Sequence, residues 1–189
     1  MNWRQEFDET GALLTGHFKL SSGLHSDRYL QCALVLQWPE RARRIGDALA
    51  DLLGSFSPSV VVGPALGGVI VGYETARALG VRSVFTERKD GAMQLRRGFG
   101  FARGERAIVV EDVFTTGKST RETIAAVEQH GARVVAAGSI VDRGLAPDAL
   151  AVPWRSLLAI EAPAWPANAC PLCAEGFPVE APGSRHPAA

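Results

Sequence analysis

The sequence predicts an α/β fold in which a central, mostly parallel sheet is flanked by helices. Short apolar runs rich in β-branched residues alternate with segments of helical periodicity, and glycines end the helical segments. The strand-like runs are continuously apolar rather than alternating, as in strands that are covered on both faces. We therefore expect a parallel sheet at the centre of the chain.

The first 38 residues precede this sheet and are expected to form a small hood. They contain a short helical segment, followed by Ser21-Ser22-Gly23, which predicts a turn between two extended segments. Pro39 then begins a helix with one apolar face, as proline is favoured in the first turn. That face carries Ile45, Leu49, Leu52 and Leu53.

The core, residues 39–161, continues as alternating strands and helices, and the proline- and alanine-rich residues 162–189 predict a partly irregular tail. We expect residues 1–189 to form a single domain. Within it, the expected strands are residues 59–63, 81–86, 106–112, 133–142 and 156–161, and the expected helices are residues 67–80 and 118–130.

Bulk composition excludes several classes of protein. With 189 residues, of which 47% are hydrophobic, the chain can bury a sizeable core. Its 20 basic and 20 acidic side chains cancel, so we expect neither a nucleic-acid nor a membrane partner. The opening MNWRQEFDET lacks the features of a signal peptide, and no apolar run approaches a membrane span, so a cytoplasmic location is expected.

The stretch VVEDVFTTGKST, residues 109–120, joins the expected strand at residues 106–112 to the expected helix at residues 118–130. Its Gly117-Lys118-Ser119 ending resembles a nucleotide-binding P-loop, but that pattern needs a glycine where Asp112 stands. A helix that starts directly after a strand still offers backbone N–H groups and a positive dipole end to one phosphate. Hydroxyl donors are added by Thr115, Thr116, Ser119 and Thr120.

Two acids, Glu111 and Asp112, end the strand that leads into this loop. They belong at the crevice where open α/β sheets bind ligands, and carboxylates there accept hydrogen bonds from sugar hydroxyls or help to hold hydrated Mg²⁺. A ribose 5-phosphate satisfies both the acids and the loop. The alternative is an ordinary turn capped by Asp112, but two acids at the end of a buried apolar strand favour a ligand.

This stretch resembles the 5-phosphoribosyl 1-diphosphate motif of the type I phosphoribosyltransferases. Similarity to the orotate-using branch of that family spans nearly the whole chain. The resemblance implies the type I phosphoribosyltransferase fold, a homodimer, Mg²⁺ as cofactor, and transfer of ribose 5-phosphate to orotate, giving orotidine 5′-phosphate and diphosphate in pyrimidine (UMP) biosynthesis. It rests on residues 16–31, 61–72, 109–120, 139–144 and 170–176.

Carried over position by position, the resemblance assigns the acid pair to the ribose hydroxyls and the following loop to the 5-phosphate. It assigns the binding of orotate to four residues, one of which is Arg143. The planar guanidinium of Arg143 suits a carboxylate. The alternatives are an ion pair of Arg143 with Asp142, and a role in the core for Tyr29 and Leu30 of the hood. The phosphate set is Glu111, Asp112, Val113, Phe114, Thr115, Thr116, Gly117, Lys118 and Ser119, and the orotate set is Thr115, Arg143, Tyr29 and Leu30.

Two further segments face the leaving diphosphate in this resemblance. Residues 65–68 offer backbone N–H groups after the first core strand, with a tight strand–helix turn as the alternative. Residues 87–106 are basic and punctuated by glycine, which is typical of a mobile lid, with a solvated hairpin as the alternative. The diphosphate loop is Ala65, Leu66, Gly67 and Gly68, and the expected catalytic pair that opens the lid is Arg88 and Lys89.

The chain departs from the family pattern at several cationic positions. A lysine and a histidine usual in the lid are missing where the chain has Ala92, Met93 and Gln94, and two further lysines are replaced by Ser21 and Gly67. A short-loop branch of the family or substitution by other cations would account for this. The departures leave open a phosphoribosyltransferase for another base, or a non-catalytic regulator that senses 5-phosphoribosyl 1-diphosphate. The candidate substitutes are Lys19, Arg96 and Arg97.

The cysteines are too few for a disulfide framework. Cys170 and Cys173 have the spacing of half a zinc site, which needs two further ligands. His186, Cys32 or a partner subunit are candidates for these, and reduced packing thiols are the alternative. The other histidines, His17, His25 and His130, are expected to be surface or hydrogen-bonding residues.

Overall fold

The computed structural model describes residues 2–20 and 22–182, and the chain divides into two compact units. Unit 1 comprises Met1–Leu34 together with Glu161–Ala189, and unit 2 comprises Val35–Ile160. The expected hood and the expected tail are thus parts of one unit, although more than a hundred residues of chain separate them.

Unit 2 contains a sheet whose described strands lie in the order β5-β4-β3-β6-β7-β8, and all neighbouring pairs except β4 and β5 are parallel. Every residue of β3 is buried, as the continuous apolar run predicts. The mostly parallel sheet confirms the expected fold class. The strands are β3 (Val60–Pro64), β4 (Arg82–Lys89), β5 (Ala92–Leu95), β6 (Arg106–Phe114), β7 (Arg133–Asp142) and β8 (Trp154–Ala159).

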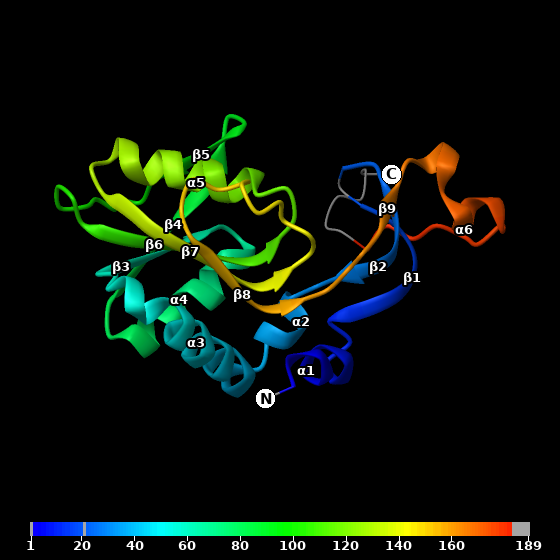
Figure 1. The fold of residues 1–189 in the computed structure, drawn as a ribbon, viewed down its shortest axis with the longest axis horizontal. Helices are drawn as coiled ribbons and strands as arrows, with labels where there is room; N and C mark the ends of the chain where they lie inside the picture. The colour runs from blue at the N-terminus through cyan, green and yellow to red at the C-terminus, as the bar shows by residue number, and fades with distance from the viewer. Residues whose placement is uncertain (1, 21, 183–189) are drawn as a thin grey trace. The chain divides into compact units, whose positions relative to one another are not determined.

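Helices cover both faces of this sheet: α3 (Pro39–Leu53) and α4 (Gly67–Leu79) lie on one face, and α5 (Lys118–Gln129) lies on the other (Figure 1). Gly46 lets α3 approach α4, because a Cβ at this position would lie 2.6 Å from the backbone of Glu74. Leu52, expected on the buried face of α3, is exposed because it lies about 100° around the helix from the buried Leu53. Two short elements, α2 (Ala33–Leu36) and η1 (Gly54–Phe56), flank α3.

The order of the strands creates a topological switch point between β3 and β6. From β3 the chain continues through α4 to β4 on one side, and it then returns to place β6 on the other side of β3. The connections that leave the carboxyl ends of β3 and β6 therefore diverge to opposite faces. Open α/β sheets bind their ligands in the crevice that forms at such a point.

Unit 1 is built on a smaller antiparallel sheet of order β1-β2-β9. The expected turn between two extended segments is confirmed, with Gly23 at φ 84° between β1 and β2, while Ser21 lies outside the described residues. The tail is more regular than expected, because β9 pairs with β2 and a short helix follows. The elements are α1 (Trp3–Glu9), β1 (Leu13–Lys19), β2 (His25–Leu30), β9 (Ala164–Trp165), η2 (Ala167–Ala169) and α6 (Pro171–Ala174).

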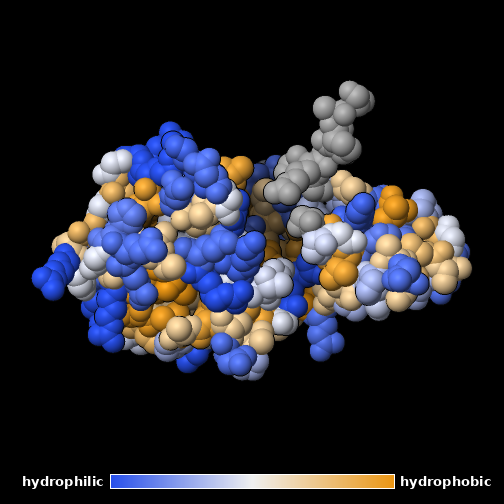
Figure 2. Space-filling model, turned by 90° about the horizontal axis from the view of Figure 1, so that it is seen from above, coloured by the Kyte–Doolittle hydropathy of each residue, from blue (hydrophilic) through white to orange (hydrophobic). Residues whose placement is uncertain are grey.

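Among the described residues, no helix has both the length and the apolar character needed to cross a membrane. On the face drawn in Figure 2, hydrophobic residues are scattered among hydrophilic ones.

Candidate active site

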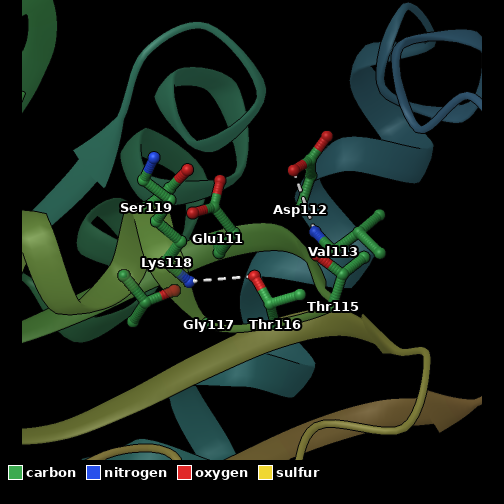
Figure 3. A pocket seen from close by; sticks show the side chains of 9 residues that line it. Glu111, Asp112, Val113, Thr115, Thr116, Gly117, Lys118 and Ser119 are labelled. Carbon is green, nitrogen blue, oxygen red and sulfur yellow. Dashed lines mark hydrogen bonds between the residues drawn. The ribbon is translucent and has the colours of Figure 1, made fainter. Parts of the chain in front are cut away.

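A pocket lies at the carboxyl end of β6, where the strand turns into α5 (Figure 3). All of the predicted phosphate set except Phe114 line it. The ring of Phe114 is 1% exposed and packs edge-on against Trp154, so this side chain belongs to the core, and the assignment of Phe114 to the 5-phosphate stays a prediction. The lining residues are Glu111, Asp112, Val113, Thr115, Thr116, Gly117, Lys118, Ser119 and Thr120.

The loop in this pocket is shaped for a helix start. Gly117 has φ 71° and stands directly before α5, and a Cβ there would lie 2.9 Å from Leu145, so glycine is required on both counts. The Lys118 N–H donates to the Thr116 hydroxyl over 3.4 Å (Figure 3). At such a helix start, backbone N–H groups and the positive dipole end favour an anion.

Arg121 is a loop-positioning residue that the sequence reasoning missed. Its Nη1 donates to the carbonyl of Thr116 over 2.9 Å and to the carbonyl of Ala149 over 3.1 Å. The phosphate loop is thereby tied to the segment that precedes β8. Its position directly after the recognised motif was the only signal in the sequence, because the second contact comes from 28 residues away.

The two acids are held in an environment that disfavours two negative charges. Glu111 is 8% exposed, and its Oε2 atom has no hydrogen-bond partner among the described residues. Burial raises the pKa of Glu111 well above its usual value, and the neighbouring Asp112 raises it further. Burial also raises the pKa of Asp112, opposed by the Val113 N–H that donates to Asp112 Oδ1 over 2.8 Å (Figure 3). Hydroxyl donors or a cation from a ligand would relieve this arrangement.

The expected diphosphate loop, residues 65–68, lies beside these acids. A Cβ on Gly67 would collide with the carboxylate of Asp112, and a Cβ on Gly68 would lie 2.7 Å from the Val110 carbonyl oxygen. Glycine at position 68 is therefore required by close packing against backbone, whereas at position 67 the nearest atoms belong to the Asp112 carboxylate, which places this loop beside Asp112. A lysine at position 67 would require the Asp112 carboxylate to move, which gives a physical reason for its replacement by glycine.

The basic segment begins as a hairpin, which was the alternative interpretation for residues 87–106. Asp90 and Gly91 have φ 51° and 83°, as in a two-residue turn between paired Lys89 and Ala92. Arg88 forms an ion pair with Glu122 of α5, and the Nζ of Lys118 lies 3.9 Å from the same carboxylate. Arg88 is thus placed beside the first turns of α5, and Lys89 is exposed.

Two of the candidate substitute cations already have partners. Arg97 donates to both carboxylate oxygens of Glu87, over 2.7 and 2.9 Å, and Arg96 lies 3.6 Å from the same carboxylate. Recruiting either residue to a diphosphate would require it to leave Glu87. Lys19 lies in unit 1, on β1.

Arg143 joins the site through the backbone. Its N–H donates to the carbonyl of Phe114 over 2.9 Å, which places it next to the phosphate loop at the carboxyl edge of the sheet. Asp142, the alternative ion-pair partner, accepts the N–H groups of Gly144 and Leu145 with its Oδ1, over 2.9 and 2.8 Å. The other predicted orotate residues, Tyr29 and Leu30, lie on β2 of unit 1, and their role stays a prediction.

A second cluster of polar side chains lies within unit 1. Cys170 and Cys173 meet His17 and His25 there, with all four candidate ligand atoms within 4.8 Å of one another. Cys32 is not a member of this cluster, and His186 lies outside the described residues. Both histidines form hydrogen bonds as expected, but they are buried rather than on the surface.

A mostly parallel sheet with an acid pair and a phosphate loop at its switch point defines the class, a phosphoribosyltransferase. The family model for the phosphoribosyl transferase domain matches residues 33–171. Orotate phosphoribosyltransferases of Thermotoga petrophila and Pelotomaculum thermopropionicum are 50% and 51% identical to the chain; the alignments cover 96% and 95% of this chain and 97% and 94% of theirs. The chain belongs to the orotate phosphoribosyltransferase family.

Solved structures have the same fold. The orotate phosphoribosyltransferase from Aeropyrum pernix, 27% identical, superposes with a TM-score of 0.74 over 85% of this chain and 94% of its own. The Mycobacterium tuberculosis enzyme in complex with 5-phospho-alpha-D-ribosyl 1-diphosphate, 24% identical, has a TM-score of 0.66 over 84% of this chain and 96% of its own.

Proposed function

We propose that this chain is a pentosyltransferase that transfers the ribose 5-phosphate of 5-phosphoribosyl 1-diphosphate to orotate, giving orotidine 5′-phosphate and diphosphate in pyrimidine (UMP) biosynthesis. One observation carries the proposal: a buried acid with an unpartnered oxygen, Glu111, and a partly buried one, Asp112, directly precede a phosphate loop at the switch point of the sheet. Relatives at about half identity that are named orotate phosphoribosyltransferase support it.

The acid pair and the loop divide the donor substrate between them. Glu111 and Asp112 accept hydrogen bonds from the ribose hydroxyls, which gives the unpartnered Glu111 Oε2 a donor. The N–H groups at the start of α5 and the hydroxyls of Thr115, Thr116 and Ser119 bind the 5-phosphate. Arg121 keeps the loop in place through the Thr116 carbonyl.

The acceptor lies at the neighbouring strand end in this proposal. The Arg143 guanidinium binds the orotate carboxylate, Thr115 contacts the ring from the phosphate loop, and Tyr29 and Leu30 from the hood flank the pyrimidine. Holding both substrates in line is the main source of rate, because an orotate anion needs little acid–base chemistry to attack C1 of the ribose.

The leaving diphosphate is assigned to residues 65–68, with the catalytic pair Arg88 and Lys89 closing over it. Mg²⁺ is the proposed cofactor; when bound with the substrate it neutralises charge on the diphosphate oxygens. The donor set fits this ion, because the Asp112 carboxylate beside the diphosphate loop would offer it oxygen ligands. Arg88 must exchange its partner Glu122 for the substrate during closure.

The proposal includes a homodimer and a cytoplasmic location. An exposed apolar row supports the dimer: Leu66, Ile70 and Tyr73 are 89%, 48% and 63% exposed, and their spacing of four and three residues places them on one side of the start of α4. Sedimentation of the purified chain tests it. A Tyr73→Asp variant should shift the equilibrium toward monomer, and an unchanged dimer would place the interface elsewhere.

The decisive test is a turnover assay with Mg²⁺, 5-phosphoribosyl 1-diphosphate and a panel of bases. We expect diphosphate release with orotate and none with adenine, guanine or uracil. Turnover only with another base would replace orotate as the acceptor. Binding of 5-phosphoribosyl 1-diphosphate without release of diphosphate for any base would instead identify a sensing regulator.

Lys89 provides a residue-level test. The Lys89→Ala variant should lose most of kcat while its affinity for 5-phosphoribosyl 1-diphosphate is largely kept, since the side chain is assigned to the leaving group. The Arg133→Ala variant is a matched control, because Arg133 is exposed at the opposite end of β7 from Arg143. Unchanged kcat in Lys89→Ala would remove the residue from the catalytic pair.

A further inference from the structure

The cluster of His17, His25, Cys170 and Cys173 lies wholly in unit 1, whereas the phosphate pocket lies wholly in unit 2. The histidines come from β1 and β2, and the cysteines from the amino end of α6 (Figure 1). The proposed transfer reaction uses none of the four side chains. Three of them, His17, His25 and Cys170, are no more than 6% exposed.

The fold directs these side chains inward by identifiable local devices. A register shift between Thr15 and Phe18 interrupts the pairing of β1 with β2, and His17 and Phe18 are both buried although they are adjacent in the strand. Cys170 stands immediately before α6 and Cys173 lies in it, three residues on, so both sulfurs occur on one turn. Separate parts of the chain thus deliver four ligands to one point.

The hydrogen bond of His17 fixes which of its nitrogens is available. Its Nδ1 lies 2.8 Å from the carbonyl oxygen of Phe177. A carbonyl only accepts, so Nδ1 carries the proton and, in the neutral ring, Nε2 presents a bare lone pair. Histidines that bind metals are typically oriented by such a second hydrogen bond to a carbonyl.

Three potential donors converge on that single lone pair. His17 Nε2 lies 2.9 Å from His25 Nδ1, 3.5 Å from Cys170 Sγ and 3.6 Å from Cys173 Sγ. One lone pair cannot accept hydrogen bonds from a ring N–H and two thiols at once, so hydrogen bonding alone accounts poorly for the arrangement. A cation between the four atoms accounts for all of the contacts.

The spacing matches a tetrahedral zinc ion. Zn–N bonds of about 2.0 Å and Zn–S bonds of about 2.3 Å give tetrahedron edges of about 3.3 Å between nitrogens and about 3.5 Å between nitrogen and sulfur. The sulfur–nitrogen distances here are 3.5, 3.6 and, for Cys173 and His25, 3.3 Å. The nitrogen–nitrogen distance of 2.9 Å is shorter, so the two rings would move apart by about half an ångström on binding.

We propose that His17, His25, Cys170 and Cys173 bind one structural Zn²⁺ ion that fastens the tail of the chain to the β1–β2 hairpin. Two thiolates balance the charge of the ion, and four protein ligands leave no open position for substrate, which is typical of a structural site. The backbone continues the same connection, because Glu180 N donates to the His17 carbonyl over 2.8 Å and Lys19 N donates to the Glu180 carbonyl over 2.7 Å. This inference is independent of the proposed transferase activity.

Metal analysis of the purified chain tests the proposal. After growth with added zinc and dialysis against metal-free buffer, elemental analysis should find about one zinc per chain in the wild type. The Cys170→Ser and His25→Ala variants should retain less than about a tenth of that. Cys32→Ser and His130→Ala are matched controls that should keep the full amount, because neither residue belongs to the cluster.

Two measurements on the wild-type chain keep the test decisive if a ligand variant does not fold. X-ray absorption at the zinc edge should show two sulfur and two nitrogen neighbours at about 2.3 and 2.0 Å. Replacement by Co²⁺ should produce thiolate-to-cobalt charge-transfer absorption and the strong visible bands of tetrahedral cobalt. A folded chain with no bound zinc, a zinc shell without sulfur, or a Cys170–Cys173 disulfide in the purified protein would each overturn the proposal.

Discussion

In the phosphate pocket of unit 2, all the lining side chains come from the ten positions 111–120, whereas in the histidine–cysteine cluster of unit 1 the ligands are up to 156 residues apart. A contiguous loop has its shape determined locally, by a strand end, a glycine and a helix start. A cluster of distant residues exists only when tertiary structure is complete. The two sites should therefore respond differently to perturbation: substitutions in the loop should lower affinity for the ligand, and substitutions in the cluster should destabilise the structure.

The largest expected effect is the loss of stability in unit 1 when the histidine–cysteine cluster is emptied of zinc. Removing zinc from the wild type with a chelator should expose the tail to proteolysis while unit 2 stays resistant. An ion that binds only the folded state at a thousand times its Kd stabilises by about 4 kcal/mol, so a comparable loss in unfolding free energy is expected. Limited proteolysis with mass spectrometry measures it, and equal protection of the tail with and without chelator would break the contrast.

Substitutions in the acid pair, Glu111 and Asp112, should instead lower the affinity for substrate and leave the fold intact. Asp112→Asn and Glu111→Gln should raise KM for 5-phosphoribosyl 1-diphosphate about 10- to 100-fold, because a hydrogen bond to a charged group contributes about 1.5–3 kcal/mol. The fold should be unaffected. Steady-state kinetics measures KM, and thermal unfolding of the same samples checks that the fold is kept. The control is Glu128→Gln, at an exposed position on α5. Unchanged KM in both variants would remove the acids from the ribose site.

Substitutions of the two neighbouring glycines at the switch point, Gly67 and Gly68, should have different effects: one on substrate affinity and the other on stability. Gly68→Ala should cost about 1–3 kcal/mol of stability, since its Cβ would meet Pro64 and the Val110 backbone. Gly67→Ala meets only the Asp112 carboxylate, which can rotate, so it should weaken 5-phosphoribosyl 1-diphosphate binding with little change in stability. Urea unfolding and calorimetric titration distinguish the two; identical effects in the two variants would contradict the assignment.

The smallest expected effect is a dependence of stability on pH. The pKa of Glu111 is raised in the folded chain, so the ligand-free protein should lose stability as pH rises from the unfolded pKa of about 4.3 through the higher folded value. Glu111→Gln should flatten this decline in part, leaving the share that belongs to Asp112. Melting temperatures of both proteins between pH 4 and pH 8 measure it. Parallel curves would show that the pKa of Glu111 is the same in the folded and unfolded states.

The phosphate loop was predictable because its determinants are adjacent in the chain, and the parallel sheet because its strands are continuously apolar. Phe114 was the exception in the loop: the resemblance counts it with its neighbours, but strand geometry turns its side chain into the core. The hairpin at residues 82–95 is indicated in the sequence by Asp90-Gly91, a dipeptide that strongly favours a two-residue turn. The basic residues of the same segment favoured a lid instead.

The histidine partners of the cysteines were not predictable. Cys170 and Cys173 give a recognisable spacing, but nothing adjacent to His17 or His25 indicates that a bulge turns one of them inward. The contact between Gly67 and Asp112 likewise depends on strand order, which brings β3 and β6 together over an intervening helix and two strands. In both cases the missing information is tertiary, because it concerns which distant segments become neighbours.

Unit 1 is assembled from Met1–Leu34 and Glu161–Ala189, with all of unit 2 between them in the chain. On the ribosome, therefore, β1 and β2 emerge before unit 2 and must wait for the whole of unit 2 before β9 and the cysteines arrive. Unit 2 can complete its sheet during that interval. The order of synthesis lets unit 2 be completed before unit 1, and it leaves His17 and His25 without their cysteine partners until all of unit 2 has been made.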